Sequence, residues 1–236
     1  MTNSICIIPA RSGSKRINSK NIKNFCGIPM LKRAIITAQS CKFIDEVFVS
    51  TDCENIAEMA KLWGASAPFI REENLSDDFT PTKPVIQDTI ERLKKIYPKK
   101  IYDYVLCLYP CTPFIKSRHL ESAFNKIFGL NYEMLFPIEL YKHPIQRAFE
   151  LGENNVKFRE PEFELTRTQD LNTYYHDAGQ FYLGSTNSWI SDKALHSSAN
   201  GIIFENDFFM DIDTPEDWRM AEVVFNSLFV DRRTDD

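Results

Sequence analysis

The sequence predicts an α/β fold with a doubly wound, mostly parallel sheet. Two observations support this prediction: short apolar runs alternate with segments of helical periodicity, and the runs end in polar residues. Strands and helices that alternate at this spacing are typical of parallel sheets with helices on both faces. Four strand exits, at Ala10, Thr51, Ile70 and Tyr109, would meet at one edge of the sheet. Because ligands bind at that edge, we expect the functional site there.

The predicted strands and helices follow one another along the chain. Apolar segments bounded by turn-forming residues predict strands at 5–10, 47–52, 67–70, 103–108 and 134–137. Apolar residues at helical spacing predict helices at 29–40, 55–63, 83–97 and 117–128. Later predicted elements are strands at 179–184 and 202–204 and a helix that begins at Thr214 and Pro215.

The pattern changes between residues 138 and 172, where helical periodicity weakens and charges mix with short β-favouring pieces. One interpretation is a long surface excursion, but an unstructured loop of this length is unusual in a compact domain. We therefore predict one domain over residues 1–236 with an arm or small β lobe inserted at 138–172.

Composition limits the classes of function. The 236 residues are 43% hydrophobic and carry a net charge of −5, which suits an ordinary globular domain. No run approaches the roughly 18 apolar residues of a membrane helix, and the N-terminus shows no export signal. The six scattered cysteines predict reduced thiols and a cytoplasmic location. Because the chain is acidic overall, with a net charge of −5, we expect no nucleic-acid partner, and we expect no membrane partner either.

The loop after the first predicted strand concentrates positive charge. It places Gly13 between two serines and carries four cations within ten positions: Arg11, Lys15, Arg16 and Lys20. A loop whose backbone N–H groups can approach a ligand, and which also supplies cations, suits phosphate binding. The alternative is a solvated charged face. However, no acidic residue precedes Asp45, and the cations directly follow a core strand, so we favour anion binding. The P-loop and dinucleotide fingerprints are absent because Gly13 is the only glycine before Gly27.

Two carboxylates near the C-terminus form a second candidate site. Asp211 and Asp213 are two residues apart, so in an extended segment both side chains point to the same face. This arrangement suits Mg²⁺, which uses one or two carboxylates together with phosphate oxygens and water. The alternative is that Asp213 caps the following helix and Asp211 is solvated. The phosphate-binding loop in the same chain favours the metal interpretation.

Three motifs resemble one family. The run Ala-Arg-Ser-Gly-Ser-Lys-Arg-Ile with a later Lys-Asn, at residues 10–21, resembles the signature of the CMP-nonulosonate synthetases. These enzymes are cytidylyltransferases that activate sialic-acid-like sugars. Residues 175–182 are most similar to the branch that acts on pseudaminic acid, and residues 211–218 resemble the family's metal-binding end. The resemblance therefore covers nearly the whole chain.

The resemblance implies a nucleotide-diphospho-sugar transferase fold and a nucleotidyl transfer. The anomeric hydroxyl of the sugar would attack the α-phosphate of CTP, giving a CMP-sugar and pyrophosphate, with Mg²⁺ held by Asp211 and Asp213. The implied catalytic residues are Arg11, Lys20 and Asp211. The implied nucleotide-binding residues are Ala10, Arg11, Ser12, Gly13, Lys15, Lys20, Asn21, Arg71 and Thr80.

The resemblance also implies a homodimer in which the arm at 138–172 contributes to the partner's sugar site. The candidate sugar-binding residues are Tyr109, Lys142, Arg147, Arg167, His176 and Gln180. Each arm cation could instead be a plain surface charge, and His176 could be structural. Asn18 stands where the first motif often has proline, which would loosen the loop without removing charge.

Two departures concern the sugar. Tyr109 stands where sialic-acid enzymes usually carry Gln, and His-Asp-Ala-Gly at 176–179 replaces their Arg-Pro-Asn-Gly. The lost amide and cation argue against N-acetylneuraminate, because polar pockets discriminate through unpaired groups. Pseudaminic acid is the first expectation. The alternatives are another sugar acid, such as legionaminic acid or Kdo, or a catalytically idle nucleotide-binding module.

Overall fold

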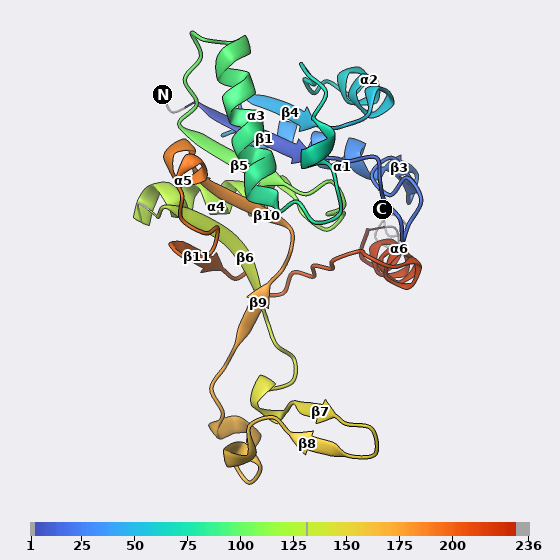
Figure 1. Cartoon of the computed structure of the whole chain (residues 1–236), viewed down its shortest axis with the longest axis vertical. Coiled ribbons are helices and arrows are strands. Elements are labelled where there is room, and N and C mark those ends of the chain that lie inside the picture. The colour runs from blue at the N-terminus through green and yellow to red at the C-terminus, as the bar shows by residue number, and fades with distance from the viewer. Residues whose placement is uncertain (1–2, 131, 230–236) are drawn as a thin grey trace, which may run out of the picture. The chain divides into compact units, whose positions relative to one another are not determined.

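The computed structural model describes residues 3–130 and 132–229, and the chain forms two compact units (Figure 1). The first unit comprises residues 1–137 and 179–236, and the second comprises residues 138–178. The second unit starts where the predicted insertion starts but continues to Ala178. The reason is that strand β9 (Tyr175–Asp177) pairs with the last residues of β6 (Met134–Leu140) inside it.

The first unit is built on the predicted sheet, whose strands run in the order β11-β6-β10-β5-β1-β4. Besides β6, these strands are β1 (Ser4–Pro9), β4 (Glu46–Ser50), β5 (Tyr104–Leu108), β10 (Phe181–Ser185) and β11 (Ala199–Ile202). Strand β1 pairs in parallel with β4 on one side and β5 on the other, and β6 pairs in parallel with β11. Strand β10 runs antiparallel to its neighbours β5 and β6. The strand order therefore reverses at β1, and in such sheets ligands bind at the reversal.

Helices cover both faces of the sheet, with α3 in front of it in Figure 1. They are α1 (Met30–Gln39), α2 (Glu54–Leu62), α3 (Thr82–Ile96), α4 (Ser117–Leu130), α5 (Thr186–Ile190) and α6 (Pro215–Phe229). On one face, Ile5 and Ile7 of β1 pack in a buried cluster with Ile86 and Ile90 of α3. Within the described part of the chain, no helix is long and apolar enough to cross a membrane.

Two sequence predictions about strands are wrong. No strand forms at 67–70; the backbone there makes only an isolated bridge between Ser66 and Phe48. Pro68 has no N–H to donate, so the pairing cannot continue past it as a regular ladder. The strand predicted at 202–204 lies instead at Ala199–Ile202, beside β6.

The start of α6 is fixed by a reciprocal pair of caps. The Asp217 N–H donates to Thr214 Oγ1 at 3.1 Å, while Asp217 Oδ2 accepts from the backbone N–H of Thr214 at 2.7 Å and of Asp213 at 3.0 Å. This capping box satisfies helix N–H groups that would otherwise lack partners. The alternative that the Asp213 side chain caps the helix is therefore wrong, and its carboxylate is available elsewhere.

The smaller elements connect these parts. In the first unit they are the hairpin strands β2 (Asn24–Phe25) and β3 (Ile28–Pro29) and the 3₁₀ turn η1 (Glu73–Leu75). In the second unit they are the hairpin strands β7 (Phe149–Leu151) and β8 (Val156–Phe158) and the turns η2 (Ile145–Arg147), η3 (Pro161–Phe163) and η4 (Thr168–Asp170). The second unit is held together by the β6–β9 pairing and by buried Gln146, which donates to the Asn172 carbonyl at 3.0 Å.

Candidate active site

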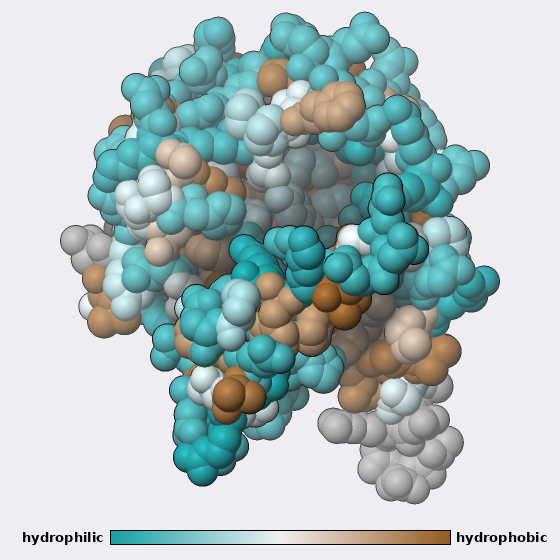
Figure 2. Space-filling view, turned by 60° about the horizontal axis from the view of Figure 1, so that its bottom comes forward, coloured by the Kyte–Doolittle hydropathy of each residue, from teal (hydrophilic) through white to brown (hydrophobic). Residues whose placement is uncertain are grey.

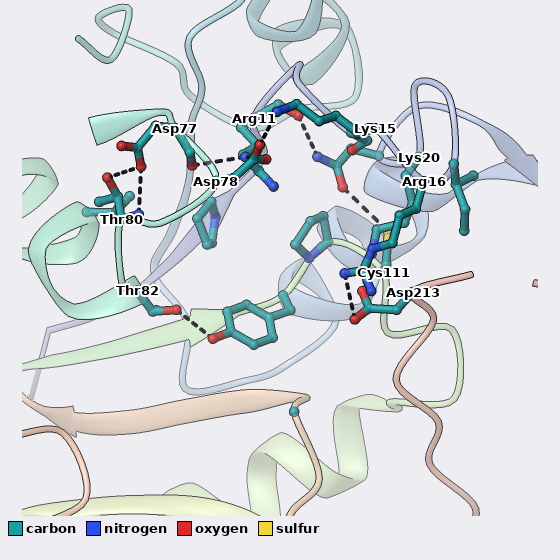
Figure 3. Close-up of a pocket in the computed structure, with 18 of the residues that line it drawn as sticks. Arg11, Lys15, Arg16, Lys20, Asp77, Asp78, Thr80, Thr82, Cys111 and Asp213 are labelled. Carbon is teal, nitrogen blue, oxygen red and sulfur yellow. Dashed lines mark hydrogen bonds and ion pairs between the residues drawn. The ribbon is translucent and has the colours of Figure 1, made fainter. Parts of the chain in front are cut away.

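A pocket of about 350 Å³ lies at the carboxyl ends of β1 and β5, where the strand order reverses (Figure 3). Five segments of the first unit line it: the loop after β1, the segment from Arg71 into the start of α3, the turn after β5, Gly179 just before β10, and the stretch before α6. Nine of the predicted residues line it: Arg11, Lys15, Lys20, Asn21, Arg71, Thr80, Tyr109, Asp211 and Asp213. The pocket thus lies at the sheet edge where the sequence places the site.

Sequence reasoning missed further lining residues as site residues, among them Ser14, Asp77, Asp78, Thr82 and Cys111. Arg16 was predicted only as a cation of the anion-binding loop, and it lines the pocket too. The two acidic residues had no comparable signal, since a polar loop is usually just a solvated connection.

Asp78 holds two of the loop cations. Its Oδ1 lies 2.6 Å from Arg11 Nη1, and its Oδ2 pairs with Lys15. Arg11 Nη1 also donates to the Asp77 carbonyl at 2.9 Å. Hydrogen bonds from Lys15 and then Arg11 hold the pKa of Asp78 below its ordinary value, so this carboxylate is ionised at neutral pH.

Asp213 holds the other two loop cations. Its Oδ2 lies 2.8 Å from Arg16 Nη2, and its Oδ1 lies 3.2 Å from Lys20 Nζ. Lys20 also donates to the Ile212 carbonyl at 2.6 Å, and its side chain is only 21% exposed. Two carboxylates from distant segments therefore pair with all four cations of the loop, and the six side chains together keep a net positive charge.

Asp211 completes the pair of candidate metal ligands. Burial and then the negative charge of Asp213 raise the pKa of Asp211. A cation bound beside it would favour the ionised form of this carboxylate. Gly179 passes close by in a left-handed conformation with φ of 62°, and a Cβ there would lie 3.8 Å from the Asp211 carboxylate. Within residues 3–130 and 132–229, no three His, Cys, Asp or Glu side chains cluster as metal ligands. A metal at Asp211 and Asp213 would therefore complete its shell with other oxygens.

The start of the loop is held by backbone contacts. Buried Ala10 donates its N–H to the Ser50 carbonyl at 2.9 Å, and the Ser12 N–H and hydroxyl both donate to Asp52 at 2.8 Å. Ala10, Ser12 and Gly13 do not line the pocket, and their phosphate-binding role stays a prediction. Around Gly13 there is open space, with no atom within 4 Å of a Cβ built there.

Asn21 fastens the other end of the loop. Its Nδ2 donates to the Arg11 carbonyl at 2.8 Å, and its Oδ1 accepts from the Cys111 thiol at 3.4 Å. Burial raises the pKa of Cys111 to about 12, so this thiol stays protonated and can donate. Asn21 lines the pocket and also fixes the shape of the loop.

Arg71 and Thr80 lie near the two ends of the loop between Arg71 and Thr82. Arg71 is 4% exposed, and its side chain donates to Ser76 Oγ at 3.1 Å and to the Ser50 carbonyl at 3.3 Å. Burial lowers the pKa of Arg71, but a guanidinium remains charged in proteins. The Thr80 hydroxyl donates to Asp77 Oδ1 at 2.6 Å. Both residues face the pocket, as a nucleotide-binding role requires.

Tyr109 and Gln180 differ in their access to the pocket. The Tyr109 hydroxyl is 2.6 Å from Thr82 Oγ1 at the pocket wall (Figure 3). Gln180 is fully buried; its backbone carbonyl accepts from the Tyr109 N–H at 3.0 Å, and its side chain donates to the Met210 carbonyl at 3.4 Å. Gln180 does not line the pocket, so a direct contact with the sugar stays a prediction.

The other four sugar-binding candidates belong to the second unit. Lys142 is exposed, Arg147 donates to the Thr166 carbonyl, and Arg167 donates to Asp170 Oδ2 at 2.7 Å. The ring of His176 packs against Tyr141, with ring centroids 4.9 Å apart. Their roles toward the sugar stay predictions.

The chain has an α/β fold with a charged pocket where the strand order reverses, and comparisons with known proteins identify its class. A family model described as cytidylyltransferase matches residues 5–211. A structure of CMP:2-keto-3-deoxy-manno-octonic acid synthetase in complex with CTP covers 97% of this chain and 100% of its own, with a TM-score of 0.69 at 13% identity. That likeness shows the fold, and the family match shows the class: the chain belongs to the cytidylyltransferase family.

Two relatives are closer in sequence. A pseudaminic acid cytidylyltransferase from Campylobacter jejuni is 40% identical over 226 residues, covering 94% of this chain and 95% of the relative. A CMP-N,N′-diacetyllegionaminic acid synthase from Legionella pneumophila is 33% identical over 229 residues, covering 92% and 94%. Both matches run through the second unit as well as the first, because each spans nearly the whole chain.

Proposed function

We propose that this enzyme transfers CMP from CTP to pseudaminic acid and releases pyrophosphate. The observation that carries the reaction is the pocket itself, in which four loop cations and the Asp211–Asp213 pair face one cavity at the sheet edge. The choice of sugar is supported by the relative of that name, which shares 40% identity along almost the whole chain.

In the proposed reaction, an anomeric oxygen forms a bond to the α-phosphorus of CTP while the bond from that phosphorus to the pyrophosphate oxygen breaks. Negative charge grows on the phosphoryl oxygens and on the leaving group, so catalysis depends on positioning and electrostatic stabilisation. Arg11 would bind the phosphates through two parallel hydrogen bonds, whereas Lys15 and Lys20 would act as point charges. Arg71 and Thr80 would contact the cytosine and ribose.

We also propose that Asp211 and Asp213 hold Mg²⁺. Both carboxylates line the pocket, and burial and then the negative charge of Asp213 raise the pKa of Asp211, so a cation bound there would favour its ionised form. This donor set fits Mg²⁺, which needs only one or two carboxylates when phosphates supply the rest. Mg²⁺ bound there would offset the charge of the phosphates and lower the pKa of the attacking hydroxyl. Lys20 keeps Asp213 in place through its bond to the Ile212 carbonyl.

The proposal includes a homodimer formed through the second unit and a cytoplasmic location. Large hydrophobic side chains of this unit are unusually exposed, including Leu165 at 95%, Leu151 at 86% and Val156 at 60%. Hydrophobic patches also appear among the hydrophilic residues in Figure 2, and such patches mark interaction surfaces. Six free thiols support a reducing compartment. Arm residues Lys142, Arg147, Arg167 and His176 would then reach the partner's sugar.

The first experiment measures pyrophosphate release from CTP with pseudaminic acid, legionaminic acid and N-acetylneuraminate in parallel, with and without Mg²⁺. We expect Mg²⁺-dependent release with pseudaminic acid. Release with another acid alone would keep the reaction and change the substrate. If the folded protein released no pyrophosphate with any of the three acids, a nucleotide-binding module without catalysis would be favoured.

A further inference from the structure

The turn at residues 77–80, which we call the acidic turn, supports its own shape. Asp77 Oδ1 accepts from the backbone N–H of Phe79 at 3.0 Å and from the N–H and hydroxyl of Thr80, both at 2.6 Å. Side chains of Asp or Asn often close turns in this way, by bonding backbone groups two or three residues later. The acidic turn can therefore keep its form without help from the rest of the pocket.

The acidic turn is joined to the phosphate-binding loop by charge. Within the described residues, the hydrogen bonds and ion pairs that join 77–79 to anything beyond segment 71–82 all go to Arg11 and Lys15. Phe79, next in the chain, is 89% exposed, so its ring provides no buried anchor. These ion pairs are partly open to solvent, because the Lys15 side chain is 80% exposed and that of Asp78 is 28% exposed. Ion pairs of this kind are weak and easily exchanged.

From this geometry we propose that the Asp78 carboxylate competes with the triphosphate for Arg11 and Lys15, and we call this competition the gate. In the nucleotide-free enzyme that carboxylate takes the place of a phosphate on Arg11 and Lys15, and an entering triphosphate displaces it. This inference rests on the proposed function, which assigns those two cations to CTP. It adds a role for Asp78, which would weaken binding of the nucleotide instead of supporting it.

The gate also gives a reason for selectivity among anions. A lone phosphate can offer little more to Arg11 and Lys15 than the carboxylate it must displace. A triphosphate offers several charged oxygens at once and can engage Lys20 as well, so it outcompetes Asp78. Once the Asp78 carboxylate is displaced, the described residues retain one polar link between the acidic turn and the loop, from Arg11 to the Asp77 carbonyl, so the turn is freer to move as a unit.

The test compares CTP binding by calorimetry, with Mg²⁺ and without any sugar acid, in the wild type and two variants. Asp78→Asn removes the competing charge and keeps the shape. Glu73→Gln is the matched control, because Glu73 is an exposed acid in the same loop and makes no contact with Arg11 or Lys15. We expect Asp78→Asn to bind CTP about three- to tenfold more tightly, as the loss of one or two exposed ion pairs implies. Glu73→Gln should stay within about twofold of the wild type, since it removes only a distant solvated charge.

Backbone hydrogen exchange gives a second readout. CTP should leave exchange at Phe79 and Thr80 of the wild type unchanged, because their N–H groups stay bonded to Asp77 Oδ1 when the acidic turn is released as a unit. Equal CTP affinity in Asp78→Asn and Glu73→Gln would overturn the gate, and so would weaker binding by Asp78→Asn. Asp78→Ser serves as a second variant if thermal unfolding shows that the first is poorly folded. If the wild type binds no CTP and releases no pyrophosphate, the proposed function fails and the gate fails with it; normal release with unchanged affinities rejects the gate alone.

Discussion

The two ends of the pocket bind the cations of the same loop in different ways. Asp78 and Asp213 each hold two of its cations, yet only Asp213 is fixed by its surroundings. Its backbone N–H is bound by the α6 cap, and its partner Lys20 is 21% exposed and bonded to the neighbouring carbonyl. Asp78 lies on a turn whose partner Lys15 is 80% exposed. The pairs at Asp213 thus have supporting protein bonds, whereas the Asp78 pairs are the contacts that the proposed gate displaces.

The largest effect should come from the Asp213 end. Asp211→Ala should lower turnover on the order of 10²–10³-fold, the range measured when one electrostatic stabiliser of a transition state is lost. The fold should be intact, because the raised pKa of Asp211 means that its ionised form is not a source of stability. Steady-state rates across a Mg²⁺ titration check this, with Glu216→Gln on α6 as the control. A near-normal rate of the Asp211→Ala variant at low Mg²⁺ would contradict the assignment of Asp211 as a metal ligand.

A buried histidine outside the pocket, His119, should make the folded protein less stable at low pH, and this sets a lower pH limit for binding experiments on the pocket. Burial lowers the pKa of His119 to about 4, although nearby Asp207 opposes the shift. Between pH 6.5 and 4 the unfolded chain binds a proton that the folded chain does not, so stability falls as the pH falls. The loss should reach about 3 kcal/mol. Urea unfolding of the wild type and His119→Gln measures it; parallel pH profiles for the two would contradict the assignment.

Paired lysine variants test the contrast between fixed and removable contacts. Lys20→Met should weaken CTP binding about 10- to 100-fold, because it removes a part-buried charge with two protein partners. Lys15→Met should cost no more than about fivefold, since an exposed cation contributes little. Calorimetry with CTP and Mg²⁺ gives both values. Equal losses would mean that burial does not distinguish the two ends.

The smallest effect on the kinetics should come from Tyr109, which lies on the pocket wall between the Asp78 end and the Asp213 end. Tyr109→Phe removes the hydrogen bond to Thr82 and should raise the KM for the sugar acid by about fivefold, near 1 kcal/mol. The KM for CTP should not change, and Thr82→Val should reproduce the effect. A change in the KM for CTP instead would move Tyr109 from the sugar to the nucleotide.

Much of this site could be predicted because its signals are local. Four cations in one loop and two aspartates two residues apart are visible in the sequence, and each set lines the pocket. The pairing of these cations could not be predicted, since Arg11 and Asp78 are 67 positions apart and meet only in the folded chain. Most strands were placed for a similar reason, as apolar runs are local patterns. The strand at 67–70 failed because Pro68 interrupts the pairing that its neighbours suggest.

The antiparallel strand β10 has a consequence for how such a chain can be rebuilt. Strands β6 and β10 are sheet neighbours, with Leu135 opposite Leu183 and Met134 opposite Gly184. In topological terms, the whole second unit is the connection between two neighbouring antiparallel strands, the place that a short turn takes in a β-hairpin. A short designed turn in place of residues 138–178 would therefore leave every strand of the first unit with its partner. Grafting residues 138–178 from a relative would therefore measure the contribution of this unit separately from that of the pocket.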